Sequence, residues 1–461
     1  MVSEQYVLGV DLSASQNVFF LAERKIGRIV YSEKIGQGAF YNFNVGSDDE
    51  VSRRKASGLL PNDWERPADV SRDDVRVIDL EYLGFAPQDR AGAFLRDGVL
   101  EFLDHARERG GVSFSNDDLF AVGFSVAGKV FDNGERDGTV LFLGANTPSR
   151  FGRDIGGGQI AIDATSYLRE ALPNTVVSGG FRGGNDCNTI GMAVARVYQS
   201  QGYDPEKTYY ITVSNGIGGG GPLDLVDEIG HHTAGGVHPS VQLRCGCGKL
   251  NCVEAYASGT GLPNLARAIL GVVKSPDFIN FAAYERENGY PGLFHDVPNS
   301  TLMRDFSPSR PITSKAIFDA MRQGDGFAAY LVDRSSRMIA QVITDLALDY
   351  DLQIVGVGGG VGQNEPALIT TVQTHVKGIL DGCALVKGVM VEANPLGKAA
   401  NAYGALGPVI PEEYASVWAA TMLEAAGKVR EGDQATLERL QLVAPPATVQ
   451  QPTNPRLTTN R

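Results

Sequence analysis

The stretch Cys245-Gly246-Cys247-Gly248-Lys249-Leu250-Asn251-Cys252-Val253-Glu254 guides the interpretation of the whole chain. It holds three of the five cysteines, and His231, His232 and His238 lie shortly before it. Thiolate sulfur and neutral imidazole are preferred zinc ligands, and three cysteines with one histidine form a standard tetrahedral structural site. The segment therefore predicts a bound metal ion. Glu254, two residues after the last cysteine, is placed to direct a carboxylate into a neighbouring cleft.

Two other interpretations of these cysteines are small buried side chains and a disulfide framework. The clustering in so short a stretch argues against the first. The chain begins Met1-Val2-Ser3-Glu4-Gln5, without a basic start or an apolar run, so we expect no secretory signal. No run of about eighteen apolar residues predicts a membrane span. We therefore expect a cytoplasmic protein, in which clustered cysteines more often hold metal than form disulfides.

The composition indicates a large, acidic globular protein. The chain has 461 residues, 43% of them hydrophobic, which allows two or three domains with a sizeable core. Its 56 glycines suit many tight loops between strands and helices. The formal net charge of -13 argues against nucleic acid or an anionic membrane as the main partner, because both bind through basic patches.

Apolar runs and apolar residues at helical spacing alternate along the chain. The predicted strands are Tyr6–Val10, Val18–Ala22, Ile29–Tyr31, Leu119–Ser125, Thr175–Val177, Tyr209–Val213 and Leu352–Val357. The predicted helices are Ala91–Arg109, Ile160–Glu170, Cys187–Gln199, Val253–Leu270, Ser314–Arg322 and Gly326–Leu348. This alternation predicts an α/β fold with largely parallel sheets. Residues 41–75 and 273–310 resemble insertions, and the polar tail from Ala444 is predicted to be disordered.

Two glycine-rich loops follow predicted strands, at residues 216–221 and 358–362, and we expect such turns to open helices. Backbone amides at a helix N-terminus bind anions, and glycine lets a phosphate approach them closely. Neither loop has the Gly-Lys-Ser/Thr ending of a Walker motif, and neither has the setting of a dinucleotide-binding unit. The pair favours a nucleotide cleft, although a purely structural turn is the alternative for each loop.

Two acidic residues could carry chemistry: Asp186, after the glycine-rich residues that follow Thr175–Val177 and are interpreted as a loop, and Asp11, at the end of the first strand. Asp186 stands with Asn185 between a strand and a helix, where a carboxylate can accept the proton of an attacking hydroxyl. The alternative is that Asp186 caps the following helix. Asp11 ends the first strand and could orient Mg²⁺ beside nucleotide phosphates. Its alternative is a turn or cap aspartate.

Taken together, these features resemble the ROK family (repressors, open reading frames and sugar kinases) of the actin, hexokinase and Hsp70 superfamily. The resemblance runs with gaps from about Val7 to Leu406, and its most specific part is Glu228-Ile229-Gly230-His231 followed by the cysteine stretch. Further matching segments are Asn185-Asp186-Cys187-Asn188, Ser214 to Gly220, Val355 to Val361, and Leu396-Gly397 with Tyr403-Gly404-Ala405.

The resemblance implies a two-lobed actin/hexokinase-like (ribonuclease H-like) fold with a central ligand cleft and a zinc knot in the larger lobe. The smaller lobe would contain residues 1–145 and be completed by about 396–440. The larger lobe would contain residues 146–395, with the zinc knot at 231–254, and residues 441–461 would form the tail. The resemblance also implies a homodimer.

The resemblance further implies an ATP-dependent sugar kinase that phosphorylates a hexose or similar sugar, usually on C6, with Mg²⁺ accompanying ATP. Asp186 would be the catalytic base. The residues implied to bind the sugar are Asn185, Glu228, His231, Glu254 and Gly128. Those implied to bind the nucleotide are Asp11, Ser13, Ser15, Asn215, Gly216, Gly218, Gly219, Gly358, Gly359 and Gly360. The structural zinc would be held by His231, Cys245, Cys247 and Cys252.

The chain departs from the family pattern at three places. Ser13-Ala14-Ser15 stands where Gly-Gly-Thr is usual, and Asn215 stands where Thr is usual. These changes keep open a non-catalytic sugar-binding protein and a kinase with a donor other than ATP. The span from His231 to Cys245 is longer than usual, which leaves His238 or His232 as a rival zinc ligand. A DNA-binding repressor is not expected, because the first strand begins near Tyr6 and leaves no room for a helix-turn-helix.

Overall fold

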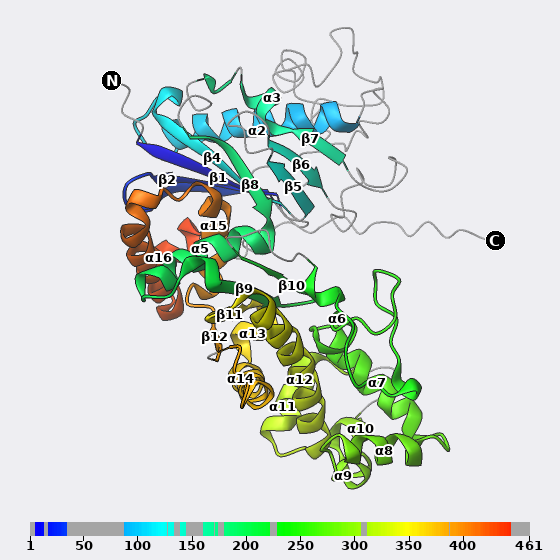
Figure 1. Cartoon of the computed structure of the whole chain (residues 1–461). Helices are drawn as coiled ribbons and strands as arrows, with labels where there is room; N and C mark the ends of the chain where they lie inside the picture. The colour runs from blue at the N-terminus through cyan, green and yellow to red at the C-terminus, as the bar shows by residue number, and fades with distance from the viewer. Residues whose placement is uncertain are drawn as a thin grey trace, which may run out of the picture.

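The computed structural model consists of sheets covered by helices (Figure 1). It describes residues 5–443 except 13–16, 35–86, 127, 133–138, 144–159, 170, 174–178, 222–227, 306–310 and 387. The predictions for segment 41–75, for the strand Thr175–Val177 and for the tail from Ala444 therefore fall on residues outside the described part. The described strands form three sheets, of five, four and three strands.

The first sheet has the order β3-β2-β1-β4-β8. Its strands are β1 (Tyr6–Leu12), β2 (Asn17–Glu23), β3 (Ile29–Lys34), β4 (Leu119–Val126) and β8 (Gly180–Asn185). Strands β1, β4 and β8 are parallel, whereas β2 pairs antiparallel with both β1 and β3. Because side chains of a strand point alternately to its two faces, β1 contributes to two cores. Leu8 and Val10 pack with helix α2 (Pro87–Glu108), and Val7 packs on the opposite face.

The second sheet has the order β10-β9-β11-β12. Its strands are β9 (Thr208–Val213), β10 (Ile217–Gly220), β11 (Ile354–Gly358) and β12 (Met390–Ala393). One face carries Ile211 and Val357, which join the core formed with the long helix α12 (Gly326–Tyr350). Helices α11 (Ser314–Arg322), α13 (Gly359–Asn364) and α14 (Pro366–Leu380) complete this side.

Helix α5 (Asp186–Ser200) joins the two sheets. Its residues Ile190 and Val194 share one core with Val7 of β1 and Tyr210 of β9. Helices α15 (Ala400–Leu406), α16 (Ala415–Glu431) and α17 (Gln434–Arg439) close this region, and Figure 1 shows α15 and α16 beside α5. The C-terminal part of the described chain thus packs between strands that lie far apart in the sequence.

The third sheet is antiparallel and consists of β5 (Gly128–Asp132), β6 (Thr139–Leu143) and β7 (Ile160–Asp163). The prediction of one helix over Ile160–Glu170 is wrong for its first part, because residues 160–163 form β7 and only α3 (Ala164–Arg169) is helical. An apolar run as short as this has no decisive period, so its pairing with β6 determines the outcome.

The segment between β10 and β11 is mostly helical in its described part. Three single-turn elements, at Ile229–His231, Pro239–Val241 and α6 (Glu254–Ala257), surround the cysteine stretch, and α7 (Gly261–Val273) follows. The predicted insertion at 273–310 contains α8 (Phe278–Glu287), α9 (Leu293–Asn299) and α10 (Thr301–Asp305). In Figure 1 these helices lie at the end of the molecule far from the first sheet.

The predicted two-lobed α/β class is confirmed, with one correction. The sheets are not largely parallel: the two larger ones are mixed, since β1–β2, β2–β3 and β9–β10 are antiparallel, and the third is wholly antiparallel. The first sheet takes β8 from beyond residue 145, and the lobe boundaries at 145 and 396 stay a prediction. Among the helices that the structure describes, none has the length and apolar content needed to cross a membrane.

Candidate functional site

The carboxyl ends of three parallel strands bring together polar residues from distant parts of the chain. The register pairs Asp11 of β1 with Ser125 of β4, and Val126 of β4 with Asn185 of β8. Ligands of open α/β sheets bind beyond the carboxyl ends of the strands. Asp11 and the Asn185-Asp186 pair, which were predicted separately, therefore share one edge of the first sheet.

Asn185 fixes the beginning of helix α5. Its Oδ1 accepts a hydrogen bond of 2.9 Å from the backbone N–H of Cys187, and its Nδ2 donates one of 2.9 Å to the carbonyl of Gly128. Asp186 is the first residue of the helix, and its Oδ1 also accepts from the Cys187 N–H at 2.9 Å. Asn185 is thus the N-cap residue, and it links the helix start to Gly128.

The two acidic groups at this edge influence each other. Asp11 is buried, and this burial, followed by the charge of Asp186, raises the pKa of Asp11 to about 8. Burial also raises the pKa of Asp186, against the hydrogen bond from Cys187, which lowers it, and the charge of Glu228 adds to the rise. Burial and like charges both disfavour an ionised carboxylate. This edge therefore favours either a proton or a cation beside the two carboxyl groups.

The first glycine loop corrects a prediction. Residues 217–220 form β10, which pairs antiparallel with β9, so this loop makes a hairpin instead of opening a helix. The turn at Ser214 to Gly216 is fixed by hydrogen bonds from Gly259 and Thr260. The N–H of Gly259 donates to the carbonyl of Ser214 at 2.6 Å, and Thr260 Oγ1 donates to the carbonyl of Asn215 at 2.7 Å. The amide groups of this turn therefore do not lie at a helix N-terminus.

The second glycine loop opens helix α13 as predicted and lies beside the first. Strand β11 pairs in parallel with β9, which sets Gly358 opposite Thr212. Gly359 has a φ of +81°, and a Cβ atom there would lie 2.5 Å from Thr212 Oγ1, so a larger residue would be strained and crowded. A Cβ atom at Gly360 would lie 3.8 Å from Ser214 Oγ. The two loops thus form adjoining parts of one surface.

The predicted metal ligands do come together. His231, Cys245, Cys247 and Cys252 each offer one ligand atom, and these four atoms lie within 4.8 Å of one another. The Sγ atoms of Cys247 and Cys252 are 3.6 Å apart, and Cys245 Sγ is 3.5 Å from His231 Nδ1. No disulfide joins these three cysteines. The segment folds back on itself through bridges between Thr233 and Cys252 and between Arg244 and Leu250.

The donor set fits a tetrahedral metal ion. Metal–sulfur bonds of about 2.3 Å and metal–nitrogen bonds of about 2.0 Å place neighbouring ligand atoms of a tetrahedron about 3.5–3.8 Å apart. The two distances within the group are of this size. Burial, followed by hydrogen bonds with Cys247 and Cys245, raises the pKa of Cys252 to about 12. Burial also raises the pKa of Cys245, whereas a backbone hydrogen bond from Lys249 lowers the pKa of Cys247. A bound cation would offset the charge of thiolates that lie this close together.

The two rival histidines do not belong to this group. His238 Nδ1 accepts a hydrogen bond from the backbone N–H of Ser240 at 3.2 Å, and its ring packs on Phe281 and Tyr284 with centroid distances of 5.7 and 5.1 Å. His232 contributes its backbone carbonyl to the N–H of Val253. His231 is therefore the histidine that the geometry places with the three sulfur atoms.

Glu254 connects the cysteine stretch with the first glycine loop. Its Oε2 accepts a hydrogen bond of 2.9 Å from the N–H of Ile217, and its Oε1 lies 3.5 Å from Cys245 Sγ. Gly216 permits this approach, because a Cβ atom there would lie 2.5 Å from Glu254 Oε2. Glu228 has a left-handed φ of 62°, and its Oε2 lies 3.5 Å from His231 Nε2. His231 thus presents one ring nitrogen to the sulfur atoms and the other to Glu228.

Two predicted nucleotide-binding residues cannot be placed, and two residues that were not predicted contact the first glycine loop. Ser13 and Ser15 lie outside the described residues. Gly259 and Thr260, which hold the turn of the first glycine loop, were not among the predicted site residues. A signal for them was available, because Ser258-Gly259-Thr260 is a run of small residues four positions after Glu254.

Comparison with known proteins adds a family assignment. A model of the ROK family matches residues 175–409, just over half of the chain. N-acetylmannosamine kinase of Escherichia fergusonii is 33% identical over 188 residues, which cover 39% of this chain and 50% of that protein. N-acetylmannosamine kinase of Yersinia pestis is 29% identical over 174 residues, which cover 36% of this chain and 45% of that protein. The match thus spans about half the length of these relatives.

Solved structures of similar chains include a ROK family glucokinase from Streptomyces griseus in complex with glucose and AMPPNP. It is 20% identical, the match covers 87% of this chain and 97% of that one, and the TM-score is 0.46. A ROK hexokinase from Thermus thermophilus is 19% identical, with coverage of 87% and 96% and a TM-score of 0.46.

Proposed function

The chain belongs to the ROK family, and from that premise we propose that it transfers the γ-phosphoryl group of ATP to a hydroxyl of a hexose or hexose-like sugar. The observation that carries this proposal is the pair of carboxyl groups of the buried Asp11 and the half-buried Asp186 at the carboxyl ends of β1 and β8. The names of the kinase relatives support the same class of reaction.

In this proposal Asp186 is the general base. As the sugar oxygen attacks the γ-phosphorus, its proton passes to the carboxylate of Asp186, and the bond between the γ-phosphorus and the bridging oxygen breaks to release ADP. The raised pKa of Asp186 makes its carboxylate a stronger base than an exposed aspartate. By resemblance to the family, the acceptor would be the C6 hydroxyl, and Asn185, Glu228, His231 and Glu254 would orient the sugar.

Asp11 and the glycine loops would receive the nucleotide. The carboxylate of Asp11 would face the Mg²⁺ that accompanies ATP, and that ion, when bound, neutralises phosphate charge. The adjoining turns at Ser214 to Gly216 and Gly358 to Gly360 offer backbone amides close to one another. The side-chain amide of Asn215 would donate to the phosphate where the family usually has a hydroxyl.

We further propose that His231, Cys245, Cys247 and Cys252 hold a structural Zn²⁺. A closed set of four protein ligands is typical of structural rather than catalytic zinc. The zinc would fix the backbone on both sides of the cysteine stretch, and with it the side chains of His231 and Glu254. Structural zinc can supply on the order of 10 kcal/mol of folding free energy.

A coupled ADP-release assay tests the kinase. Mg-ATP would be offered with a panel of hexoses, amino sugars, N-acetyl sugars and cyclitols, and ³¹P NMR would locate the phosphate on the product. We expect turnover of at least one sugar, lost in Asp186→Asn. Asp433→Asn is the matched control, because Asp433 is also an aspartate at the start of a helix, capping α17.

Silence across the panel, from folded protein that retains its metal, would contradict the ATP-dependent kinase. The same protein would then be tested for sugar binding alone and for turnover with polyphosphate. Those two results separate a sugar-binding protein from a kinase with another phosphoryl donor.

A further inference from the structure

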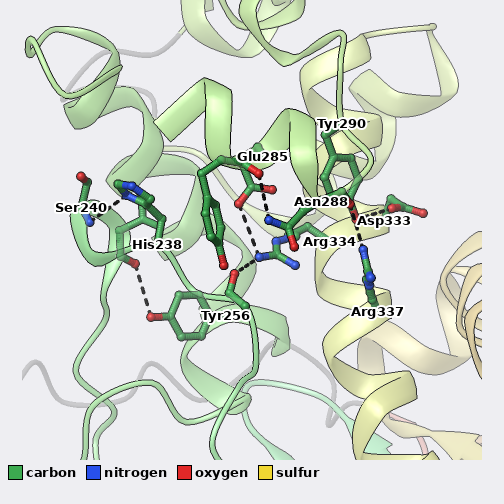
Figure 2. Close-up of polar contacts among 12 residues, drawn as sticks. His238, Ser240, Tyr256, Glu285, Asn288, Tyr290, Asp333, Arg334 and Arg337 are labelled. Atoms are coloured by element: carbon green, nitrogen blue, oxygen red, sulfur yellow. Dashed lines mark hydrogen bonds and ion pairs between the residues drawn. The ribbon is translucent and has the colours of Figure 1, made fainter. Parts of the chain in front are cut away.

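A buried ion pair links the inserted helix α8 to the long helix α12. Glu285 Oε1 lies 3.4 Å from Arg334 Nη2, and the two side chains are only 1% and 5% exposed. Figure 2 shows the two side chains facing each other between the helices. Replacing such a pair by apolar residues often leaves stability unchanged or raises it, so a buried ion pair is weak evidence for a stabilising role.

The same nitrogen of Arg334 makes a second contact. Arg334 Nη2 donates a hydrogen bond to the backbone carbonyl of Gly236. Gly236 lies in the loop of residues 232–244, which begins after the metal-group residue His231 and ends before Cys245. Arg334 therefore joins helix α12 to the loop that lies between the first and second predicted metal ligands.

Helix α8 contacts this loop at a second point. The ring of His238 packs against Phe281 and Tyr284 of α8. The loop is in turn bonded to the cysteine stretch, because the N–H of Ala234 donates to the carbonyl of Asn251 at 2.7 Å. The loop is thus fixed on one side to the metal group and on the other side to α8 and α12.

We propose that Arg334, together with Glu285, is a positioning residue that holds loop 232–244 and thereby the orientation of His231 and Glu254 toward the sugar. This inference rests on the proposed function for its link to the sugar. It also gives a role to the insertion at 273–310, since α8 supplies both the charge partner of Arg334 and the surface under His238.

The adjacent residue Asp333 offers a matched control. It accepts a hydrogen bond of 2.5 Å from Tyr290 Oη and contacts His375 Nε2 at 2.8 Å, which ties the inserted segment to α14. Figure 2 shows Asp333 away from the side of Arg334 that meets Glu285, and the guanidinium carbon of Arg334 lies 5.9 Å from the centroid of the Tyr290 ring. Within the described residues, neither the hydrogen bond of Asp333 to Tyr290 nor its contact with His375 reaches loop 232–244. A change at Asp333 therefore weakens the packing of the insertion without releasing the loop.

The decisive variant is the double substitution Glu285→Met with Arg334→Met. It removes both charges together, so no unpaired charge is left buried, and the free energy of unfolding should be unchanged or higher. The bond to Gly236 is nevertheless lost. Hydrogen exchange by mass spectrometry on the full chain should then show amides of residues 232–244 exchanging about tenfold faster, the equivalent of roughly 1.4 kcal/mol for one charge-assisted hydrogen bond.

Two further readouts separate positioning from stability. The rate at which a chelator removes the bound metal should rise about tenfold, the size typical when a partner of a metal ligand is lost. The KM for the sugar should rise several-fold while the KM for ATP stays unchanged. Asp333→Asn should reproduce none of these three effects. Arg334→Lys should show the same three effects as the double variant but to a smaller extent, because the lysine ammonium keeps the charge but lacks the planar fork of the guanidinium.

Unchanged exchange of loop 232–244 in the folded double variant would overturn the inference, and so would equal acceleration in Asp333→Asn. If the double variant does not fold, the same measurements on Arg334→Lys replace it: faster exchange of loop 232–244 supports the inference, and unchanged exchange overturns it. If the wild-type chain phosphorylates no sugar, the kinase proposal fails separately, while loop exchange and metal release still decide whether Arg334 holds the loop.

Discussion

Asp11 and Asp186 stand at the ends of strands that are hydrogen-bonded along their whole length, whereas His231, Cys245 and Glu254 lie in a segment whose regular elements are single turns. In the first region the backbone is set by the register of the sheet, so a side chain can be changed without moving it. In the second region the backbone depends on side-chain contacts and on the metal ligands. Chemistry and positioning are therefore separable by mutation in the first region and coupled in the second.

The largest expected effect tests the second region. Cys252→Ser should abolish metal binding and loosen residues 228–257, because the proposed structural zinc would supply on the order of 10 kcal/mol of local folding free energy. Sugar phosphorylation should be lost with it. Metal analysis, hydrogen exchange and activity together check this, and Cys383→Ser is the matched control, since Cys383 lies outside the metal group. A Cys252→Ser chain that keeps one metal ion and full activity would show that the two regions do not differ in this way.

The next effect tests the first region. Asp186→Asn should lower kcat by about 10²- to 10⁴-fold, the contribution of a positioned general base. Its metal content, its melting temperature and its affinity for the sugar should stay close to those of the wild type, because the register of β8 and the Asn185 cap do not depend on the Asp186 charge. Loss of metal or of folding in this variant would mean that the first region is also coupled.

The same difference explains what the sequence could predict of the site. The metal group was predictable because its four ligands lie close together in the chain and only a few donor types bind zinc. Asp11 and Asp186 were each recognisable, but their common edge depends on the order β1-β4-β8, which no local pattern specifies. Arg334 carried no signal, because one arginine in a helical pattern is usually a solvated charge.

The fold shows a similar limit. Helices α11 and α12 were predicted within two residues, because long apolar periodicity is a strong signal. The glycine-rich residues around 180–185 were interpreted as a loop and form β8, and residues 217–220 form β10. Glycine is depleted in strands, and here pairing with neighbouring strands outweighs that preference. A local sequence pattern does not show which distant strand will pair with a segment.

A smaller effect in the first region is the pH dependence of the free energy of unfolding that Asp11 causes. In the folded chain, burial and the charge of Asp186 raise the pKa of Asp11 to about 8, whereas an unfolded aspartate has a pKa near 3.9. Between these values the folded chain holds a proton that the unfolded chain has released, so the free energy of unfolding falls as pH rises through this window. Asp11→Asn cannot titrate and should remove this contribution.

Denaturant titrations at pH 5 and pH 8, without Mg²⁺, measure how much Asp11 contributes to the pH dependence of the free energy of unfolding. The difference in stability between the two pH values should shrink by roughly 2–4 kcal/mol in Asp11→Asn relative to the wild type. Equal pH dependence in both chains would mean that Asp11 is ionised at neutral pH in the free protein, and that the carboxyl edge is more open to water than its burial indicates.

The smallest effect concerns the outer part of loop 232–244. His238→Ala should keep one metal ion per chain, because His238 packs on Phe281 and Tyr284 and lies outside the group of ligand atoms. Its cost should be about 1 kcal/mol of stability, the size of an aromatic contact. His231→Ala, by contrast, should weaken or abolish metal binding. Metal analysis of the two variants side by side separates the histidines. If His238→Ala loses the metal and His231→Ala keeps it, the long spacing before Cys245 would serve to bring His238 to the metal, and loop 232–244 would be part of the metal site instead of a separate packing element beside it.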